Sequence, residues 1–296
     1  MSQAQASRTL AGIGFMLLAV ACFAALDTTS KHLGAQLPLL LVLWWRYLIQ
    51  SLISTAVLAR GRGGAIWRTR RPGLQLMRGL LLALCSLLAL ASLQVMTVGD
   101  FTTMVMISPL VISLAATLLM HEPVGARRWA LLLAGFAGAL LILRPQPGGQ
   151  MHWGLLLPVL LIIINTGFQL LTRKLAQTES SITTQLYTGW TGMALASLSL
   201  PWVWQWPAEP LQWTLLAFTG LAGAIGHYLL ILAYARASAP ILTPYMYGQI
   251  GFAVLGGWVV FGHVPDGMSL LGMTLVASSG VLGVWWTYRD SRLPAT

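Results

Sequence analysis

Charged side chains are scarce in this sequence. Asp, Glu, Lys and Arg make up 8% of the 296 residues, whereas hydrophobic residues make up 57%; a typical soluble domain carries about 25% charged residues. A chain with so few charges cannot cover its surface with groups that water solvates well. The composition therefore excludes a soluble globular domain and predicts an integral membrane protein.

Acidic residues and cysteines are fewer still. The sequence has seven Asp and Glu residues and two cysteines, Cys22 and Cys85, which both lie inside apolar runs. We expect the cysteines to be small buried side chains rather than a disulfide or a metal pair. No zinc spacing, nucleophile elbow or nucleotide-binding fingerprint occurs, and no carboxylates are paired at membrane depth. These absences argue against an enzyme, a cofactor and a bound metal ion, and the lack of a soluble domain argues against an ATP-driven pump.

Positive charge is present in excess, with 17 Lys and Arg residues and a net charge of +10. Such a surplus can indicate nucleic acid binding, but here basic residues stand between apolar runs, as in the arginine-rich segment 60–71. Basic residues at such positions face lipid headgroups and set the orientation of the chain. We therefore expect contact with membrane lipid and none with nucleic acid.

Ten apolar runs are long enough to cross a bilayer, which takes about 20 residues as a helix. They predict an all-α protein with ten transmembrane helices. The approximate limits of these runs are 9–30, 37–59, 73–95, 101–120, 127–144, 152–174, 181–203, 211–235, 240–262 and 268–288. The short breaks after the third and the eighth run predict tight helical hairpins.

A hinge motif occurs twice in the chain. His121-Glu122-Pro123-Val124-Gly125 returns 142 positions later as His263-Val264-Pro265-Asp266-Gly267, and apolar residues around it recur at the same offset. An offset of almost half the chain predicts a duplicated unit. The Pro- and Gly-rich segment 145–151 would link a first five-helix repeat, 8–144, to a second, 152–288. Because each repeat has an odd number of helices, the second must enter the membrane from the opposite side. The result is a pair of inverted repeats, an arrangement that many secondary transporters use.

The positions of Lys and Arg predict the orientation of the chain. With the N-terminus inside, fourteen of the 17 fall in cytoplasmic segments or at their edges, including Arg78 at the edge of the third run. Two, Lys31 and Arg144, fall outside, and Arg46 lies within the second run and is not counted. We therefore expect both termini in the cytoplasm.

Several short motifs resemble those of a known family. They are Asp27-x-x-x-Lys31 in the first run, Trp45-Arg46-Tyr47 in the second, Ser108-Pro109-Leu110 in the fourth, and the Glu122-Pro123 hinge before Gly135 and Gly138. Together with ten runs in two repeats, they are similar to the EamA-type transporters of the drug/metabolite transporter superfamily over residues 8–288. The resemblance implies a bacterial inner-membrane protein whose fourth and ninth helices line a central cavity. Members of the family export or import amino acids, nucleotide-like cofactors, vitamins, sugars and metallophores, so the cargo stays open.

The ninth run carries the first candidates for a substrate site. Pro244 and two glycines weaken a helix over 244–251, and broken helices line the binding sites of many transporters. The candidate side chains in this segment are Tyr245, Tyr247 and Gln249. Its counterpart at the same offset, 102–109, adds Ser108 beside a proline. A tyrosine belt at the membrane interface is the alternative, although Tyr247 and Gln249 lie deep in the run.

Two further runs place polar side chains at membrane depth. Asn165 and Gln169 are four residues apart in the sixth run and so share one helix face, and His227 and Tyr234 lie in the eighth. The amides could bind a polar substrate or hydrogen-bond neighbouring helices. His227 has no partner at metal-ligand spacing, so a proton role is possible and a metal site is not expected.

Asp27 and Arg46 are the charged candidates, because an ionisable residue within a membrane helix is costly and often functional. Asp27 could bind substrate or exchange a proton at the outer mouth of a pathway. Alternatively, it pairs with Lys31 four residues further along the same helix face. Arg46 could attract an anionic group of a substrate, or it could tie helices together through backbone carbonyls.

These features predict a secondary transporter that works by alternating access, as a monomer or homodimer. The leading expectation is an exporter of a small polar metabolite across the bacterial inner membrane: an amino acid, an amino-acid derivative or a metallophore-like compound. The alternative is an importer of a vitamin or a nucleotide-like cofactor. A channel remains possible, although broken helices in inverted repeats suit alternating access better. A membrane protein that assembles or senses without transport would need an accessory domain or a long tail.

Overall fold

The computed structural model describes residues 3–58, 60, 63–95, 98–144, 153–262 and 264–292. Over these residues the chain is helical, without strands. The elements are α1 (Gln3–Gly34), α2 (Leu39–Leu58), η1 (Gly63–Trp67), α3 (Pro72–Val95), α4 (Val98–Val105), α5 (Ser108–Met120), α6 (Ala126–Leu143), η2 (Trp153–Leu155), α7 (Leu156–Thr178), α8 (Ser181–Ser197), α9 (Leu200–Val203), α10 (Pro210–Arg236), α11 (Ala239–Met246), α12 (Gly248–Phe261) and α13 (Gly267–Arg292). The linker 145–151 and His263 lie outside the described residues.

Seven of the described helices are long and apolar enough to cross a membrane. They are α1, α2, α3, α6, α7, α10 and α13. The chain is therefore a multi-pass membrane protein built from helices. The other three predicted spans are each divided between two helices: 101–120 into α4 and α5, 181–203 into α8 and α9, and 240–262 into α11 and α12.

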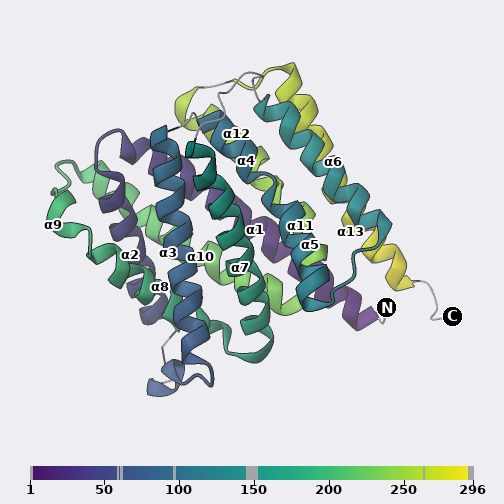
Figure 1. The fold of residues 1–296 in the computed structure, drawn as a ribbon, viewed down its shortest axis with the longest axis horizontal. Coiled ribbons are helices and arrows are strands. Elements are labelled where there is room, and N and C mark those ends of the chain that lie inside the picture. The colour runs from purple at the N-terminus through teal and green to yellow at the C-terminus, as the bar shows by residue number, and fades with distance from the viewer. Residues whose placement is uncertain are drawn as a thin grey trace.

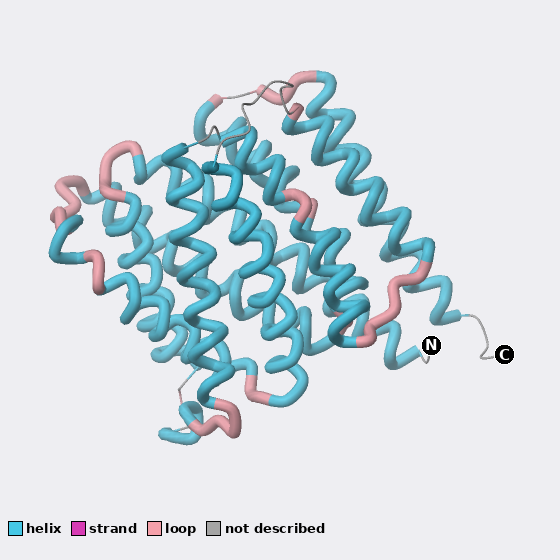
Figure 2. Tube along the Cα trace, viewed as in Figure 1, coloured by secondary structure: helices cyan, strands magenta, loops and turns pink. Residues whose placement is uncertain are grey.

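The break between α4 and α5 follows from Pro109. Proline has no backbone N–H, so the carbonyl of Val105 lacks the donor that an unbroken helix would supply four residues later. The backbone tightens instead, and the Ile107 amide donates to the carbonyl of Met104 at 3.0 Å. Pro109 then occupies the first turn of α5, where a proline is tolerated. Figure 2 draws this break as a pink loop segment inside the bundle.

The second break, between α11 and α12, falls at Tyr247. Pro244 lies inside α11 and Gly248 begins α12, so a missing hydrogen-bond donor and a residue of low helix propensity flank the break. The sequence predicted a weakened helix over residues 244–251, and the structure confirms this prediction with a break at Tyr247.

The helices pack in pairs that are far apart in the sequence. They include α1 with α10, α6 with α13, α3 with α7, α2 with α10, α1 with α12, α2 with α8, and α3 with α8. In Figure 1, α6 and α13 run side by side along one edge of the bundle, and both ends of the chain lie at the same end of the molecule. Glycines allow the α6–α13 contact, because a Cβ added at Gly272 would lie 2.6 Å from the carbonyl oxygen of Gly138.

Candidate functional site

A cavity of about 220 Å³ lies between the helices, beside both helix breaks. Its walls come from α1, α2, α3, α7 and α10 together with the residues around the two breaks. The lining residues are Met16, Val20, Phe23, Leu26, Asp27, Arg46, Leu82, Ser86, Val105, Met106, Ser108, Pro109, Asn165, Phe168, Gln169, His227, Leu230, Met246 and Gln249. Most of the polar side chains predicted from the sequence therefore lie around one space, although they come from six segments of the chain. These predicted residues are Asp27, Arg46, Ser108, Asn165, Gln169, His227 and Gln249.

Asp27 does not pair with Lys31, which the sequence offered as its alternative partner. Its carboxylate accepts a hydrogen bond from Gln249 Nε2 at 2.9 Å, which joins α1 to α12. Lys31 lies over the ring of Phe261 instead, with Nζ 5.2 Å from the ring centroid. Asp27 is thus left facing the cavity.

Arg46 projects from α2 into the same space. Its Nη2 donates to Ser86 Oγ on α3 at 3.2 Å, and its guanidinium carbon lies 4.8 Å from the ring centroid of Tyr47. The Nε of Arg46 is buried without a hydrogen-bond partner. The guanidinium therefore retains donor capacity at the cavity.

Four side chains around the cavity hold buried polar atoms that have no partner among the described residues. These atoms are Arg46 Nε, Ser108 Oγ, Gln169 Oε1 and His227 Nδ1. A buried polar atom without a partner costs about 1–3 kcal/mol. Nine further buried polar atoms without a partner among the described residues belong to side chains that do not line the cavity. The four atoms therefore show where a bound molecule or water could complete hydrogen bonds, and they do not alone identify a site.

Aromatic and methionine side chains form the apolar part of the wall. The ring of His227 lies 4.8 Å from that of Phe23 and 6.4 Å from that of Phe168, the latter edge to face. Met106 and Met246, each next to a helix break, line the cavity as well. Two phenyl rings beside amide, hydroxyl and imidazole groups suit a flat molecule with a polar edge.

Three predicted site residues lie away from this cavity. A Cβ added at Gly283 of α13 would lie 2.5 Å from Tyr245 Oη, and one added at Gly135 of α6 would lie 2.7 Å from the ring of Tyr247. Both rings thus pack toward the α6–α13 pair, where glycines make room for them. Tyr234 is fully buried in the main hydrophobic core.

Arg78 was predicted at the edge of the third span, and the structure adds that its side chain packs between helices. It is fully buried in α3, where Nε donates to Thr172 Oγ1 at 2.8 Å and Nη1 donates to Thr188 Oγ1. Its guanidinium carbon lies 4.7 Å from the ring centroid of Phe168, which lines the cavity. The only sequence signal for this role is that Arg78 stands inside the apolar run, not before it.

Glu122, which does not line the cavity, connects three segments. One carboxylate oxygen accepts from Arg173 Nε of α7 at 2.9 Å, and the other accepts from the backbone N–H of Ala239 at 3.0 Å. Arg173 also donates to the carbonyl of Tyr234 in α10. We call this group, Glu122 with Arg173, Tyr234 and Ala239, the Glu122 cluster.

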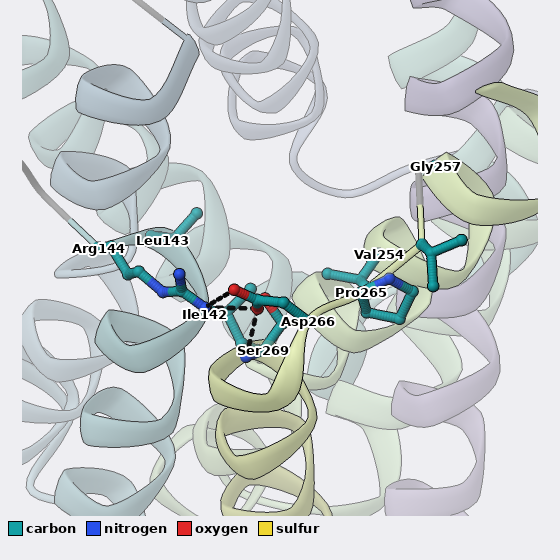
Figure 3. Close-up of a pocket in the computed structure, with 9 residues that line it drawn as sticks. Ile142, Leu143, Arg144, Val254, Gly257, Pro265, Asp266 and Ser269 are labelled. Carbon is teal, nitrogen blue, oxygen red and sulfur yellow. Dashed lines mark hydrogen bonds and ion pairs between the residues drawn. The ribbon is translucent and has the colours of Figure 1, made fainter. Parts of the chain in front are cut away.

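A second hollow lies at the opposite end of α6, between α12 and α13 (Figure 3). It is larger, about 560 Å³, but it is an open surface feature. Its charged groups, Arg144 and Asp266, are bonded to each other, and Asp266 also accepts from the backbone N–H of Ser269 at 3.0 Å. Because these charges already have partners, the hollow is a weaker candidate for a binding site than the central cavity.

Comparison with known proteins agrees with the membrane-transport architecture. The chain is 34% identical over 299 residues to a riboflavin transporter of Rhizobium johnstonii, covering 98% of this chain and 96% of that protein. It is 26% identical over 269 residues to an S-adenosylmethionine uptake transporter of Rickettsia conorii, covering 90% of each. It is also 26% identical over 269 residues to a pseudopaline exporter of Pseudomonas aeruginosa, covering 90% of this chain and 93% of that protein.

Structure and family comparisons point the same way. One solved crystal structure matches with a TM-score of 0.77 at 19% identity, covering 96% of this chain and 98% of the other, which supports the fold alone. Residues 10–144 match the EamA-like transporter family. With a relative at 34% identity over nearly the whole length, the chain belongs to the EamA-like transporter family of the drug/metabolite transporter superfamily.

Proposed function

We propose that this protein is a secondary transporter that moves a small metabolite through the central cavity by alternating access. The observation that carries the proposal is the cavity itself, which lies at two helix breaks and is lined by polar side chains from six segments of the chain. Sites of this kind, formed where membrane helices are interrupted, are common in secondary transporters. The chemistry required is binding and release, for which the lining residues suffice.

We propose further that the chain crosses the membrane ten times, as two inverted repeats over 8–144 and 152–288. Exchanging the two repeats would convert the α1–α10 pair into α7–α3, and the α2–α10 pair into α8–α3; all four pairs are in contact. The α2–α8 and α6–α13 pairs would each map onto themselves. The family match over residues 10–144, almost the first proposed repeat, is consistent with this division.

The proposed location is the bacterial inner membrane, with both termini in the cytoplasm. Both ends of the chain lie at one end of the bundle in Figure 1, as an even number of spans requires. The arginine-rich segment 60–71 and Arg127 and Arg128 would face the same side. The protein would act as a monomer or a homodimer.

For the cargo, we infer a heteroaromatic metabolite with a polar edge, of the vitamin or cofactor class, moved inward. Phe23 and Phe168 offer apolar ring surface, while Asn165, Gln169 and Gln249 offer amides. The riboflavin transporter among the relatives supports this class. Riboflavin, with a fused heteroaromatic ring and a hydroxylated chain, is the first compound to test.

Export of a small polar metabolite, such as an amino-acid derivative or a metallophore-like compound, is the second candidate. The relative described as a pseudopaline exporter favours it, and Arg46 could bind a carboxylate of such a compound. The two candidates differ in both cargo and direction, so one assay can separate them.

The test is uptake of labelled riboflavin into liposomes that contain the purified protein, compared with an amino-acid and metallophore panel. We expect saturable riboflavin uptake, reduced about tenfold in Gln169→Leu and several-fold in Ser108→Ala through loss of hydrogen bonds to the cargo. Ser278→Ala removes an exposed hydroxyl from α13 and serves as the matched control, with uptake within about twofold of the parent.

The second candidate gains if riboflavin does not enter and a carboxylate-rich compound moves instead. If the protein moves its cargo in both directions, the direction of transport in the cell is set by the concentration gradients and not by the site. A protein that moved no member of the panel would contradict the proposed cargo class.

A further inference from the structure

Arg78 is a buried cation held entirely by neutral groups. Its two hydrogen bonds end on the hydroxyls of Thr172 and Thr188, which give their own protons to backbone carbonyls in α7 and α8. Its Nη2 is buried and has no hydrogen-bond partner. The surrounding helices therefore fix the position of the guanidinium without offsetting its charge.

No carboxylate forms an ion pair with Arg78 among the residues that the structure describes. The ion pairs found there join Arg144 to Asp266 and Arg173 to Glu122. A charge buried in a membrane protein without a counter-charge is costly, and such residues commonly mark the path of a substrate or ion. Because Arg78 contacts a residue that lines the cavity, its charge can act on a molecule bound there.

Phe168 contacts Arg78 and also lines the cavity. The ring lines the cavity, Arg78 does not, and the guanidinium carbon lies 4.7 Å from the ring centroid. Two guanidiniums, those of Arg46 and Arg78, therefore act on the cavity against the single carboxylate of Asp27. His227 adds a neutral or a positive group, never a negative one.

We propose that Arg46 and Arg78 together make the cavity electropositive and select neutral or anionic heteroaromatic molecules against cationic ones. Arg46 would contact acceptor atoms of the cargo directly. Arg78 would be a positioning residue that acts across the ring of Phe168, on which the cargo stacks. This inference rests on the proposed transport of a heteroaromatic metabolite and adds the charge that the metabolite is allowed to carry.

The expected size of the effect follows from the geometry. A molecule stacked about 3.5 Å beyond Phe168 would have its ring roughly 8 Å from the charge of Arg78. At an effective dielectric constant of about 20, a unit charge at that separation changes affinity by at least about tenfold. Electrostatic selection of this size is measurable with purified protein.

Two pairs of ligands test the effect of charge, because the members of each pair share the same ring system and differ in charge. S-adenosylhomocysteine and S-adenosylmethionine differ by one methyl group and its sulfonium charge, and riboflavin and its 5′-phosphate differ by a phosphate. Binding to the purified full chain would be measured by calorimetry and, for the flavins, by quenching of their fluorescence. We expect the sulfonium compound to bind at least about tenfold more weakly than its neutral partner, and the phosphate to bind at least as tightly as riboflavin.

Variants assign the effect to residues. Arg46→Gln and Arg78→Met should each reduce discrimination against the sulfonium compound to about threefold or less, since each removes one positive charge. Arg78→Lys keeps the charge and should keep most of the discrimination, which separates an electrostatic role from a structural one. Asp27→Asn removes the opposing carboxylate and should increase discrimination. Thermal melting of each variant checks that it is folded. If Arg78→Met does not fold, Arg78→Lys is measured in its place, and a loss of discrimination in that variant would contradict an electrostatic role.

The outcomes distinguish the inference from the function on which it rests. If none of the four compounds binds, the heteroaromatic cargo class is wrong and this inference falls with it. If the compounds bind but the sulfonium is preferred, or if Arg46→Gln and Arg78→Met leave the preference unchanged, the transport proposal stands and the electropositive cavity is refuted.

Discussion

The two hinges of the chain occupy corresponding positions, yet their contacts differ. In the first, the side chain of Glu122 is 16% exposed and that of its partner Arg173 is 13% exposed, and Glu122 also accepts from the Ala239 amide. In the second, the position of Glu122 is taken by Val264, and the nearby Arg144–Asp266 pair is 43% and 55% exposed. One hinge ties helices of both halves together inside the bundle, while the other carries its ion pair at the surface (Figure 3).

The hinge motif that recurs in the sequence therefore does not carry the same ion pair at both positions. The residue that corresponds to Arg173 is Lys31, which lies over Phe261. It cannot form the corresponding ion pair, because the position of Glu122 is taken by a valine. The first hinge therefore holds a partly buried ion pair, and the second holds an exposed one. We expect the two hinges to respond unequally to loss of charge.

The largest effect should come from Glu122→Ala. Removing one partner of a partly buried pair leaves Arg173 without a counter-charge and the Ala239 amide without its acceptor. We expect a loss of about 2–3 kcal/mol, which corresponds to a Tm decrease of roughly 3–6 °C for a chain of this size. Thermal melting in detergent measures it. Arg173→Ala and the double variant complete a cycle, and additive losses would contradict the coupling of the two residues.

A smaller effect is expected from Asp266→Ala, because the Arg144–Asp266 pair is exposed and solvent screens it. Hydrogen bonds from Arg144 and then from the Ser269 backbone hold the pKa of Asp266 well below its usual range. The folded-state pKa is thus depressed, so the contribution is complete above the unfolded pKa of about 3.9 and is lost as pH falls toward the folded value.

The measurement for Asp266 is the Tm difference between the parent and Asp266→Ala as a function of pH. The difference should be constant from pH 8 to pH 5 and should shrink below about pH 4. Asp266→Asn, which can still cap the first turn of α13, separates the helix cap from the ion pair. A difference that grew on acidification would show that the sign of the linkage is wrong.

The smallest effect is expected from Val264→Glu, which places at the second hinge the acid that the first one has. Val264 is 74% exposed, and new ion pairs at exposed positions contribute about 0–1 kcal/mol. The Tm should therefore change by no more than about 2 °C. A gain as large as the loss in Glu122→Ala would mean that the chemistry at the two hinges is interchangeable.

Much of the fold follows from local sequence. Apolar run length predicted the seven described helices that are long and apolar enough to cross a membrane, whereas the count of ten spans remains a prediction. Pro109 and Pro244 predicted breaks in the runs 101–120 and 240–262, because a missing N–H acts on its own helix. Helix ends were less predictable: α1 begins at Gln3 and continues to Gly34, since polar residues with good helix propensity extend it at both ends. The division into inverted repeats remains a prediction.

The residues of the candidate site were predictable where the position of a polar residue within a membrane span is enough to indicate that it faces the interior. Asn165, Gln169 and His227 line the cavity because polar groups within a span avoid lipid and turn toward the interior. The direction of Tyr245 and Tyr247 depends on Gly283 and Gly135, which lie in distant helices, so no local pattern reveals it. Arg78 escaped for a similar reason, since only the packing of α7 and α8 over the start of α3 shows that it is covered.

The break at Pro109 has a consequence for how cargo preference can change. The carbonyl of Val105, a residue that lines the cavity, loses its helical donor through that proline, and no substitution at Val105 can delete a main-chain oxygen. Side chains around the cavity can therefore diverge while this acceptor persists. A cargo that hydrogen-bonds to this oxygen would keep that contact whatever side chain stands at position 105, and alanine scanning would not detect it.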